Sequence, residues 1–110
     1  MNTSLLGVFT GVITSLPPDG TPTGIFKRPV AGPVTVGLEG LEGDRQADRR
    51  VHGGAEKAVH LYPATHYERL TATFPALADA LVPGCMGENL SVAGWDEESV
   101  CIGDVFRIGN

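Results

Sequence analysis

Short apolar runs, separated by glycine and proline, dominate the pattern of hydrophobic and polar positions along this chain. Residues 5–14 are apolar and rich in β-branched side chains, so they predict a first strand. Residues 34–38 alternate between apolar and small or polar side chains, which is the period of a half-buried strand. Further short strands are predicted at residues 24–26, 58–62, 90–92, 100–102 and 105–108.

A helical segment follows the predicted strand at residues 58–62. Pro63 stands where the first turn of a helix tolerates proline, because the missing N–H would be unpaired there anyway. The helix is expected to end at residues 73–75, and a short second helix is expected at residues 76–81. The apolar positions that recur at helical spacing are Ala64, Tyr67, Leu70 and Phe74.

Turn residues complete the pattern. Fifteen glycines and eight prolines favour short strands, and residues 17–20 form the clearest turn. A chain of 110 residues is long enough for one domain. We therefore predict a single domain over residues 1–110, mainly β with a small helical insertion, in the form of a small barrel. About six strands are too few for closure, so we expect an incomplete barrel with exposed strand edges.

Composition and charge narrow the classes of partner. The net charge of −5 argues against nucleic acid or an anionic membrane surface. No apolar run approaches the ~18 residues of a membrane span, and the first 15 residues carry no Lys or Arg, so a cytoplasmic protein is expected. The three histidines match no zinc spacing, so no metal site is predicted. His60 on a strand and His66 on a helix are expected to be structural, and Trp95 to cover the core.

Residues 43–62 hold four of the eight cationic side chains of this otherwise acidic chain. Within them, Gly53 and Gly54 can expose consecutive backbone N–H groups, because neither has a Cβ atom. Such amides beside guanidinium groups suit a phosphate or another anion. The alternative is a solvated turn in which nearby carboxylates neutralise the charge. The four cations are Arg45, Arg49, Arg50 and Lys57.

Two segments resemble a known family. Residues 37–67 read GLEGLEGDRQADRRVHGGAEKAVHLYPATHY, and residues 84–109 read GCMGENLSVAGWDEESVCIGDVFRIG. Both are similar to the MOSC domain (the molybdenum-cofactor sulfurase C-terminal type), and most similar to its bacterial subfamily linked to N-hydroxylaminopurine resistance. The motifs GDxQAD, HGG, GENL and IGDxFRIG keep their order and spacing. The resemblance runs from residue 27 nearly to the end of the sequence.

This resemblance implies a pyruvate-kinase-like β-barrel, incomplete at the C-terminus, that binds the molybdenum-pterin cofactor. It implies reduction of N-hydroxylated compounds with electrons from a redox partner, and the family is also associated with pyridoxal phosphate binding. Glu88 would orient groups or transfer a proton, and Asn89 would bind a heterocycle edge. The alternatives are structural: Asp44 capping a turn, Glu88 and Asn89 fixing a loop, Arg45 and Arg50 facing solvent. The implied cofactor-binding set is Lys27, Arg49, His52, Gly53, Gly54, Lys57 and Asn89.

The cysteines depart from the family pattern. The family's molybdenum-ligating cysteine lies in a segment that nothing in this sequence matches. Cys85 precedes the GENL motif and Cys101 lies in a predicted strand, and both are expected to be reduced thiols rather than ligands. Two functions follow: a cofactor-binding reductase without its standard ligand, or a non-catalytic anion-binding module that completes its barrel as a homodimer or larger assembly. A third hypothesis is that Cys85 carries sulfur as a persulfide, although no cation adjoins it in the sequence to lower its pKa.

Overall fold

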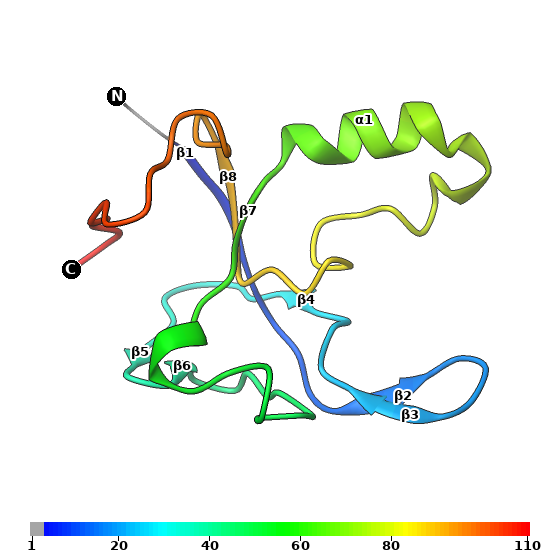
Figure 1. Cartoon of the computed structure of the whole chain (residues 1–110), viewed down its shortest axis with the longest axis horizontal. Coiled ribbons are helices and arrows are strands. Elements are labelled where there is room, and N and C mark those ends of the chain that lie inside the picture. Colours follow the sequence, from blue (N-terminus) through cyan, green and yellow to red (C-terminus); the bar gives the residue numbers. More distant parts are fainter. Residues whose placement is uncertain (1–3) are drawn as a thin grey trace.

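A four-stranded mixed sheet forms the centre of the computed structural model, which describes residues 4–110 (Figure 1). β1 (Ser4–Thr10) pairs antiparallel with β4 (Arg28–Pro29) on one side and with β8 (Leu90–Ala93) on the other. β8 also pairs in parallel with β7 (Leu61–Pro63), which gives the order β4-β1-β8-β7. Strands that are far apart in the sequence therefore lie side by side.

The parallel pair β7–β8 requires a long crossover, and the predicted helical segment supplies it. α1 (Thr65–Thr73) follows β7 and contains His66 as predicted, and the second helix is reduced to a 3-10 turn, η2 (Pro75–Leu77). The prediction for Pro63 is wrong, because this residue ends β7, where it is paired with Val92. β7 is an edge strand, and an edge tolerates a residue without an N–H donor.

Two small hairpins and a 3-10 turn lie outside this sheet. β2 (Thr14–Leu16) and β3 (Thr21–Thr23) pair around the predicted turn, and their hairpin projects away from the sheet (Figure 1). β5 (Val36–Gly37) pairs with β6 (Gly40–Leu41). The 3-10 turn η1 (Ala55–Lys57) follows the Gly-Gly pair.

The hydrophobic core is small. Among the described residues, only Phe9, Leu41, Tyr67 and Val92 are buried hydrophobic side chains. The solvent-accessible surface is 7958 Å² for a chain of 11.5 kDa, whereas a monomeric globular protein of that mass exposes about 5800 Å². A considerable apolar surface is therefore left uncovered.

Several strand predictions are wrong in extent or place. Residues 24–26 are irregular, and so are residues 58–60, so His60 precedes β7 instead of lying on a strand. The strand predicted at residues 34–38 is reduced to β5, and Leu38 is 89% exposed. β propensity describes how a side chain fits a pleated surface, but a strand also needs a neighbour for its backbone hydrogen bonds.

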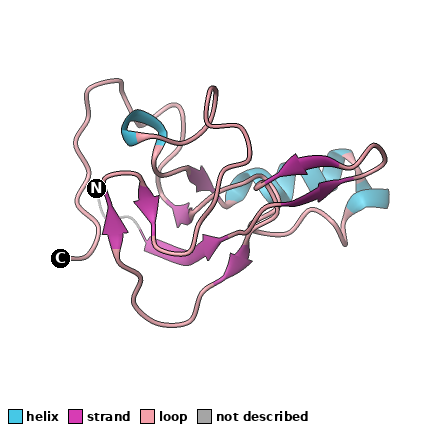
Figure 2. Ribbon diagram, turned by 90° about the horizontal axis from the view of Figure 1, so that it is seen from below, coloured by secondary structure: helices cyan, strands magenta, loops and turns pink. Residues whose placement is uncertain are grey.

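Residues 94–110 contain no helix or strand (Figure 2). A turn with a hydrogen bond from Asp104 N to Cys101 O (3.0 Å) forms between the two predicted strands, but neither strand finds a partner. Both sides of β1 are already occupied by β4 and β8. Trp95 is half-buried, with its ring centroid 4.7 Å from that of Phe106.

The fold class is confirmed: strands predominate, one α-helix is inserted, and the sheets of residues 4–110 do not close into a barrel. None of the helices in the described chain combines the length and apolar character needed to cross a membrane.

Candidate functional site

A cavity of about 700 Å³ opens between the β2–β3 hairpin, the loop at residues 45–60 and the turn that precedes β8. Small-molecule sites have volumes of about 300–1,000 Å³, so this space suits a ligand of cofactor size. Its wall is mostly apolar, with a few polar groups. The polar and glycine residues of the wall that matter below are Arg45, Gln46, His52, Gly53, Lys57, His60 and Asn89.

Two cationic residues, Arg45 and Lys57, line this cavity. Arg45 makes no ion pair within residues 4–110. Lys57 donates one hydrogen bond to the carbonyl of Val51 (3.0 Å), and an ammonium has two further donors. Asp48 and Glu56 also line the wall and oppose these charges.

Asp48 is already paired outside the cavity. Arg50 binds it through two side-chain hydrogen bonds, at 2.9 and 2.7 Å. These bonds, together with the backbone N–H of Arg50, hold the pKa of the Asp48 carboxyl below its ordinary value. The effective charge balance at the cavity is therefore slightly positive.

The Gly-Gly pair borders the same space. Both residues have positive φ, +78° for Gly53 and +76° for Gly54, a region that glycine adopts without strain. A Cβ on Gly53 would lie 2.7 Å from Oε1 of Gln46, whereas a Cβ on Gly54 would meet nothing within 4 Å. In residues 4–110 neither backbone N–H donates to a protein acceptor, so both remain available to a ligand.

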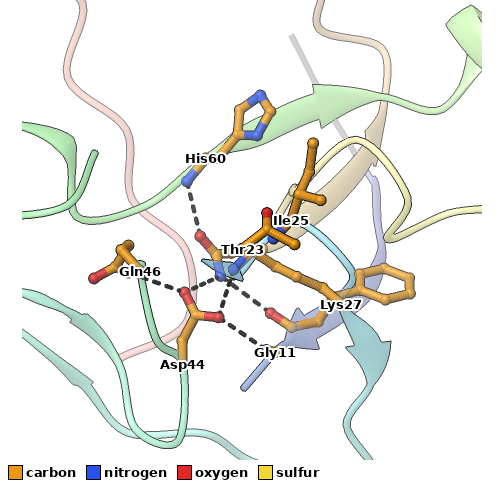
Figure 3. Close-up of polar contacts among 9 residues, drawn as sticks. Gly11, Thr23, Ile25, Lys27, Asp44, Gln46 and His60 are labelled. Carbon is orange, nitrogen blue, oxygen red and sulfur yellow. Dashed lines mark hydrogen bonds and ion pairs between the residues drawn. The ribbon is translucent and has the colours of Figure 1, made fainter. Parts of the chain in front are cut away.

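A buried carboxylate, Asp44, bonds to two residues of the cavity wall, and Figure 3 shows its polar contacts. Asp44 accepts hydrogen bonds from Gly11 N (2.9 Å), Lys27 Nζ (2.6 Å), Gln46 Nε2 (3.3 Å) and Asn89 Nδ2 (2.9 Å). The side chains of Asp44 and Lys27 are 1% and 6% exposed, so the ion pair is almost fully buried. This carboxylate holds four separate segments of the chain together.

Asn89 belongs to this network. Its amide nitrogen donates to Phe9 O (3.1 Å) and to Asp44, and its Oδ1 accepts from the backbone N–H of His60 (3.0 Å). Both amide donors are therefore in use. The role of Asn89 at a heterocycle edge stays a prediction, and the geometry favours the structural alternative.

Glu88 is fully buried. It accepts hydrogen bonds from the Tyr67 hydroxyl and from the backbone N–H groups of Gly84 (2.9 Å) and Met86 (3.2 Å). Burial first, and then the neighbouring carboxylate, raises the pKa of Tyr67 well above its ordinary value. Cys85 Sγ lies 3.8 Å from the same hydroxyl. Glu88 thus fixes the turn that carries part of the cavity wall.

The structure brings together only some of the predicted site residues. His52, Gly53, Lys57 and Asn89 line the cavity, whereas Gly54, the neighbour of Gly53 in the chain, is not part of its wall. Lys27 is buried against Asp44, while Arg49 is exposed and paired with Glu39. The candidate catalytic residues Glu88 and Cys85 lie outside the wall.

Sequence reasoning placed Arg45 in the cationic run but left it out of the cofactor-binding set, and it expected only a structural role for His60; both residues line the wall. The backbone N–H of Arg45 bonds to Gly11 O (2.9 Å), which lies 34 positions earlier in the chain. His60 is fixed by Asn89, 29 positions later. No local pattern reports such distant contacts, although the cationic run around Arg45 was a signal for it.

The donor groups of the cavity fit only part of the cofactor that the family resemblance implies. Arginine, lysine, histidine and free backbone N–H groups fit a phosphate or a polar heterocycle. A molybdenum ion needs a different donor. Within residues 4–110, no cluster of three or more His, Cys, Asp or Glu side chains is arranged for a metal, and neither Cys85 nor Cys101 lines the cavity. The residues present fit the organic part of such a cofactor and supply no thiolate for its metal.

Comparisons with known proteins identify the family. The sequence pattern of the MOSC domain matches residues 48–110. Protein YiiM of Escherichia coli is 43% identical over 93% of this chain and 45% of its own length. The crystal structure of YiiM from Escherichia coli superimposes with a TM-score of 0.66 at 32% identity, and the match covers 94% of this chain and 39% of that one.

Two further relatives are an uncharacterised protein, YflK of Bacillus subtilis, and a protein named reductase of Gibberella moniliformis. The first is 48% identical over 96% of this chain and 47% of its own length, and the second is 38% identical over 94% of this chain and 17% of its own length. The chain therefore belongs to the MOSC domain family. It spans about half the length, or less, of the curated relatives it matches.

Proposed function

We propose that the cavity binds the phosphate-bearing pterin of a molybdenum cofactor, and that the chain contributes this wall to a reductase of N-hydroxylated compounds. The cavity is of cofactor size, and its polar groups suit an anion. Membership of the MOSC family and the relative named reductase support the same reading. A cytoplasmic location and a redox partner remain predictions within this proposal.

Different groups of this wall would bind different parts of the cofactor. Lys57 and Arg45 provide positive charge for the phosphate, and the free N–H groups of Gly53 and Gly54 provide hydrogen bonds where no Cβ blocks approach. The apolar part of the wall excludes water from the ring system. When bound, the cofactor would supply two-electron redox chemistry. Its metal would need a thiolate from outside the described residues.

The observation that carries this proposal is that two cationic residues, Arg45 and Lys57, and Gly53 line one cavity, and that the backbone N–H groups of Gly53 and of its neighbour Gly54 have no protein acceptor within residues 4–110. Calorimetric titration with a pterin monophosphate tests it. Alanine at Arg45 or at Lys57 removes one charge-assisted contact at a solvent-accessible site, worth about 1 kcal/mol, so each variant should bind about fivefold more weakly.

The matched control is Arg69→Ala, because Arg69 is exposed on α1, makes no ion pair within residues 4–110 and does not line the cavity. It should bind like the wild-type protein. Equal affinity of all four proteins, or no binding by any of them, would contradict the proposal.

The second candidate function is self-association without catalysis, and the uncovered apolar surface favours it. Ile102 and Val105 are almost fully exposed, and Phe106 is 41% exposed. β4 and β7 are edge strands of the main sheet, and an edge presents unpaired backbone groups. Residues 100–108 of one copy could add to such an edge of a second copy.

Sedimentation equilibrium at micromolar concentration tests this second candidate. A dimer that dissociates when Val105 is changed to Asp would support it. A monodisperse monomer would contradict it. As a control, Leu38→Asp changes an equally exposed apolar residue of the β5–β6 turn, and it should leave the dimer intact.

A further inference from the structure

His60 combines a rigidly held backbone with an exposed side chain. Its N–H donates to Oδ1 of Asn89 (3.0 Å), and its carbonyl accepts from the N–H groups of Asn89 (2.8 Å) and Leu90 (3.0 Å). His60 is exposed and is one of the residues that line the cavity. Its ring packs edge-on against Tyr62, with centroids 5.9 Å apart. The backbone that carries this side chain is therefore fixed at the cavity wall, and the side chain is not part of the buried core.

The orientation of the Asn89 amide depends on Asp44. Two acceptors, Asp44 Oδ2 and Phe9 O, face the amide nitrogen, so the oxygen must face His60 N–H. Asp44 in turn is held by Lys27 and by Gly11 N, as Figure 3 shows. A chain of hydrogen bonds therefore runs from the buried ion pair to the backbone of His60 at the cavity wall.

We infer that His60 contacts the phosphate-bearing ligand of this cavity and that Asp44, acting through Asn89, is the residue that positions it. The inference rests on the proposed function of the cavity. An imidazole N–H is a suitable donor to a phosphate oxygen. Asp44 itself does not line the cavity, so its effect on a ligand can only be indirect.

The test uses inorganic phosphate as the probe and backbone and ring NMR signals of His60 as the readout. His60→Ala should weaken phosphate binding about fivefold without loss of the fold, because the side chain is exposed. The double variant Asp44→Asn with Lys27→Met removes the buried charges together, so that no unpaired ion is left behind. It should shift the His60 N–H resonance and weaken binding by a similar factor.

The matched control is Glu97→Gln. It makes the same change from carboxylate to amide in an ion pair with His66, at a side chain that is 71% exposed and does not line the cavity, and it should leave the His60 N–H signal and the affinity unchanged. If the buried double variant does not fold, Asp44→Glu retains the charge but displaces the carboxylate, and the same shift is expected.

Adding His60→Ala to the folded Asp44 variant should cause no further loss of phosphate affinity, because both substitutions remove the same contact between His60 and the ligand. Unchanged affinity in His60→Ala, or unchanged His60 signals in a folded Asp44 variant, would overturn the inference while leaving the proposed function intact. A wild-type protein that does not bind phosphate would contradict both.

Discussion

The hydrogen bond between Tyr67 and Glu88 offers a quantitative check on how the cavity turn is held. Glu88 is 0% exposed, and its three donors are the Tyr67 hydroxyl and two backbone N–H groups. Tyr67→Phe removes one donor and leaves the shape of the side chain intact. A hydrogen bond to a charged group contributes about 1.5–3 kcal/mol, so the free energy of unfolding should fall by about 2–3 kcal/mol.

Urea unfolding measures this loss. With a slope of about 1–1.5 kcal/mol per molar urea for a chain of this size, the midpoint should fall by about 2 M. The control is Tyr62→Phe, since the Tyr62 hydroxyl makes no hydrogen bond within residues 4–110 and its stability should change by less than about 0.5 kcal/mol. Equal, small effects of both substitutions would refute the assignment of Glu88 as the anchor of this turn.

Alkaline pH gives the same prediction a second readout. The raised pKa of Tyr67, caused first by burial and then by Glu88, means that the unfolded chain ionises this hydroxyl near pH 10 while the folded chain does not. The unfolded state then binds fewer protons, so stability falls above pH 10, by up to about 1.4 kcal/mol per pH unit. The Tyr67→Phe variant has no hydroxyl to ionise at this position. The difference in the free energy of unfolding between wild type and variant should therefore become smaller as the pH rises from 10 to 11.

Two further predictions concern other parts of the fold. A hydrogen bond from His66 lowers the pKa of Glu97 below its ordinary value, so His66→Ala should raise the pKa of the Glu97 carboxyl in an NMR titration, and an unchanged value would contradict the pairing. A Cβ on Gly84 (φ +99°) would lie 2.3 Å from Lys27 O, so Gly84→Ala should destabilise the chain by about 3 kcal/mol or more. Gly20 also has positive φ (+78°) but lies in open space, so Gly20→Ala should cost about 1 kcal/mol. Equal losses of stability for the two variants in thermal unfolding would contradict this account.

Local signals predicted the elements that depend on local chemistry. The turn at residues 17–20, a helix after the strand that ends near residue 62, and the strand at residues 90–92 all appear, although the helix begins at Thr65 rather than at Pro63. The strands predicted at residues 100–108 do not appear, because strand formation needs a partner and these residues pair with none of the strands in residues 4–110. Pairing of that kind is a property of the whole chain, so apolar alternation alone could not decide it.

In the candidate site, too, local sequence signals predicted some residues, whereas residues that depend on distant contacts were not predicted. The glycine pair and Lys57 were found from composition, because free amides and cations have a recognisable local signature. The hydrogen-bond network of Asp44 and Asn89 was not predicted, since its bonds join residues that are 33, 45 and 80 positions apart in the sequence. The motifs GDxQAD and GENL mark both residues, but a motif does not say whether a polar group faces a ligand or the interior.

The pterin content of the purified protein tests the central claim most directly. The chain, expressed in a host that makes the molybdenum cofactor, should be recovered with pterin fluorescence and bound phosphate near one equivalent. The variant with alanine at both Arg45 and Lys57 should lose most of both. Folded wild-type protein without pterin, or a double variant that retains it fully, would contradict the proposal that this cavity holds the cofactor.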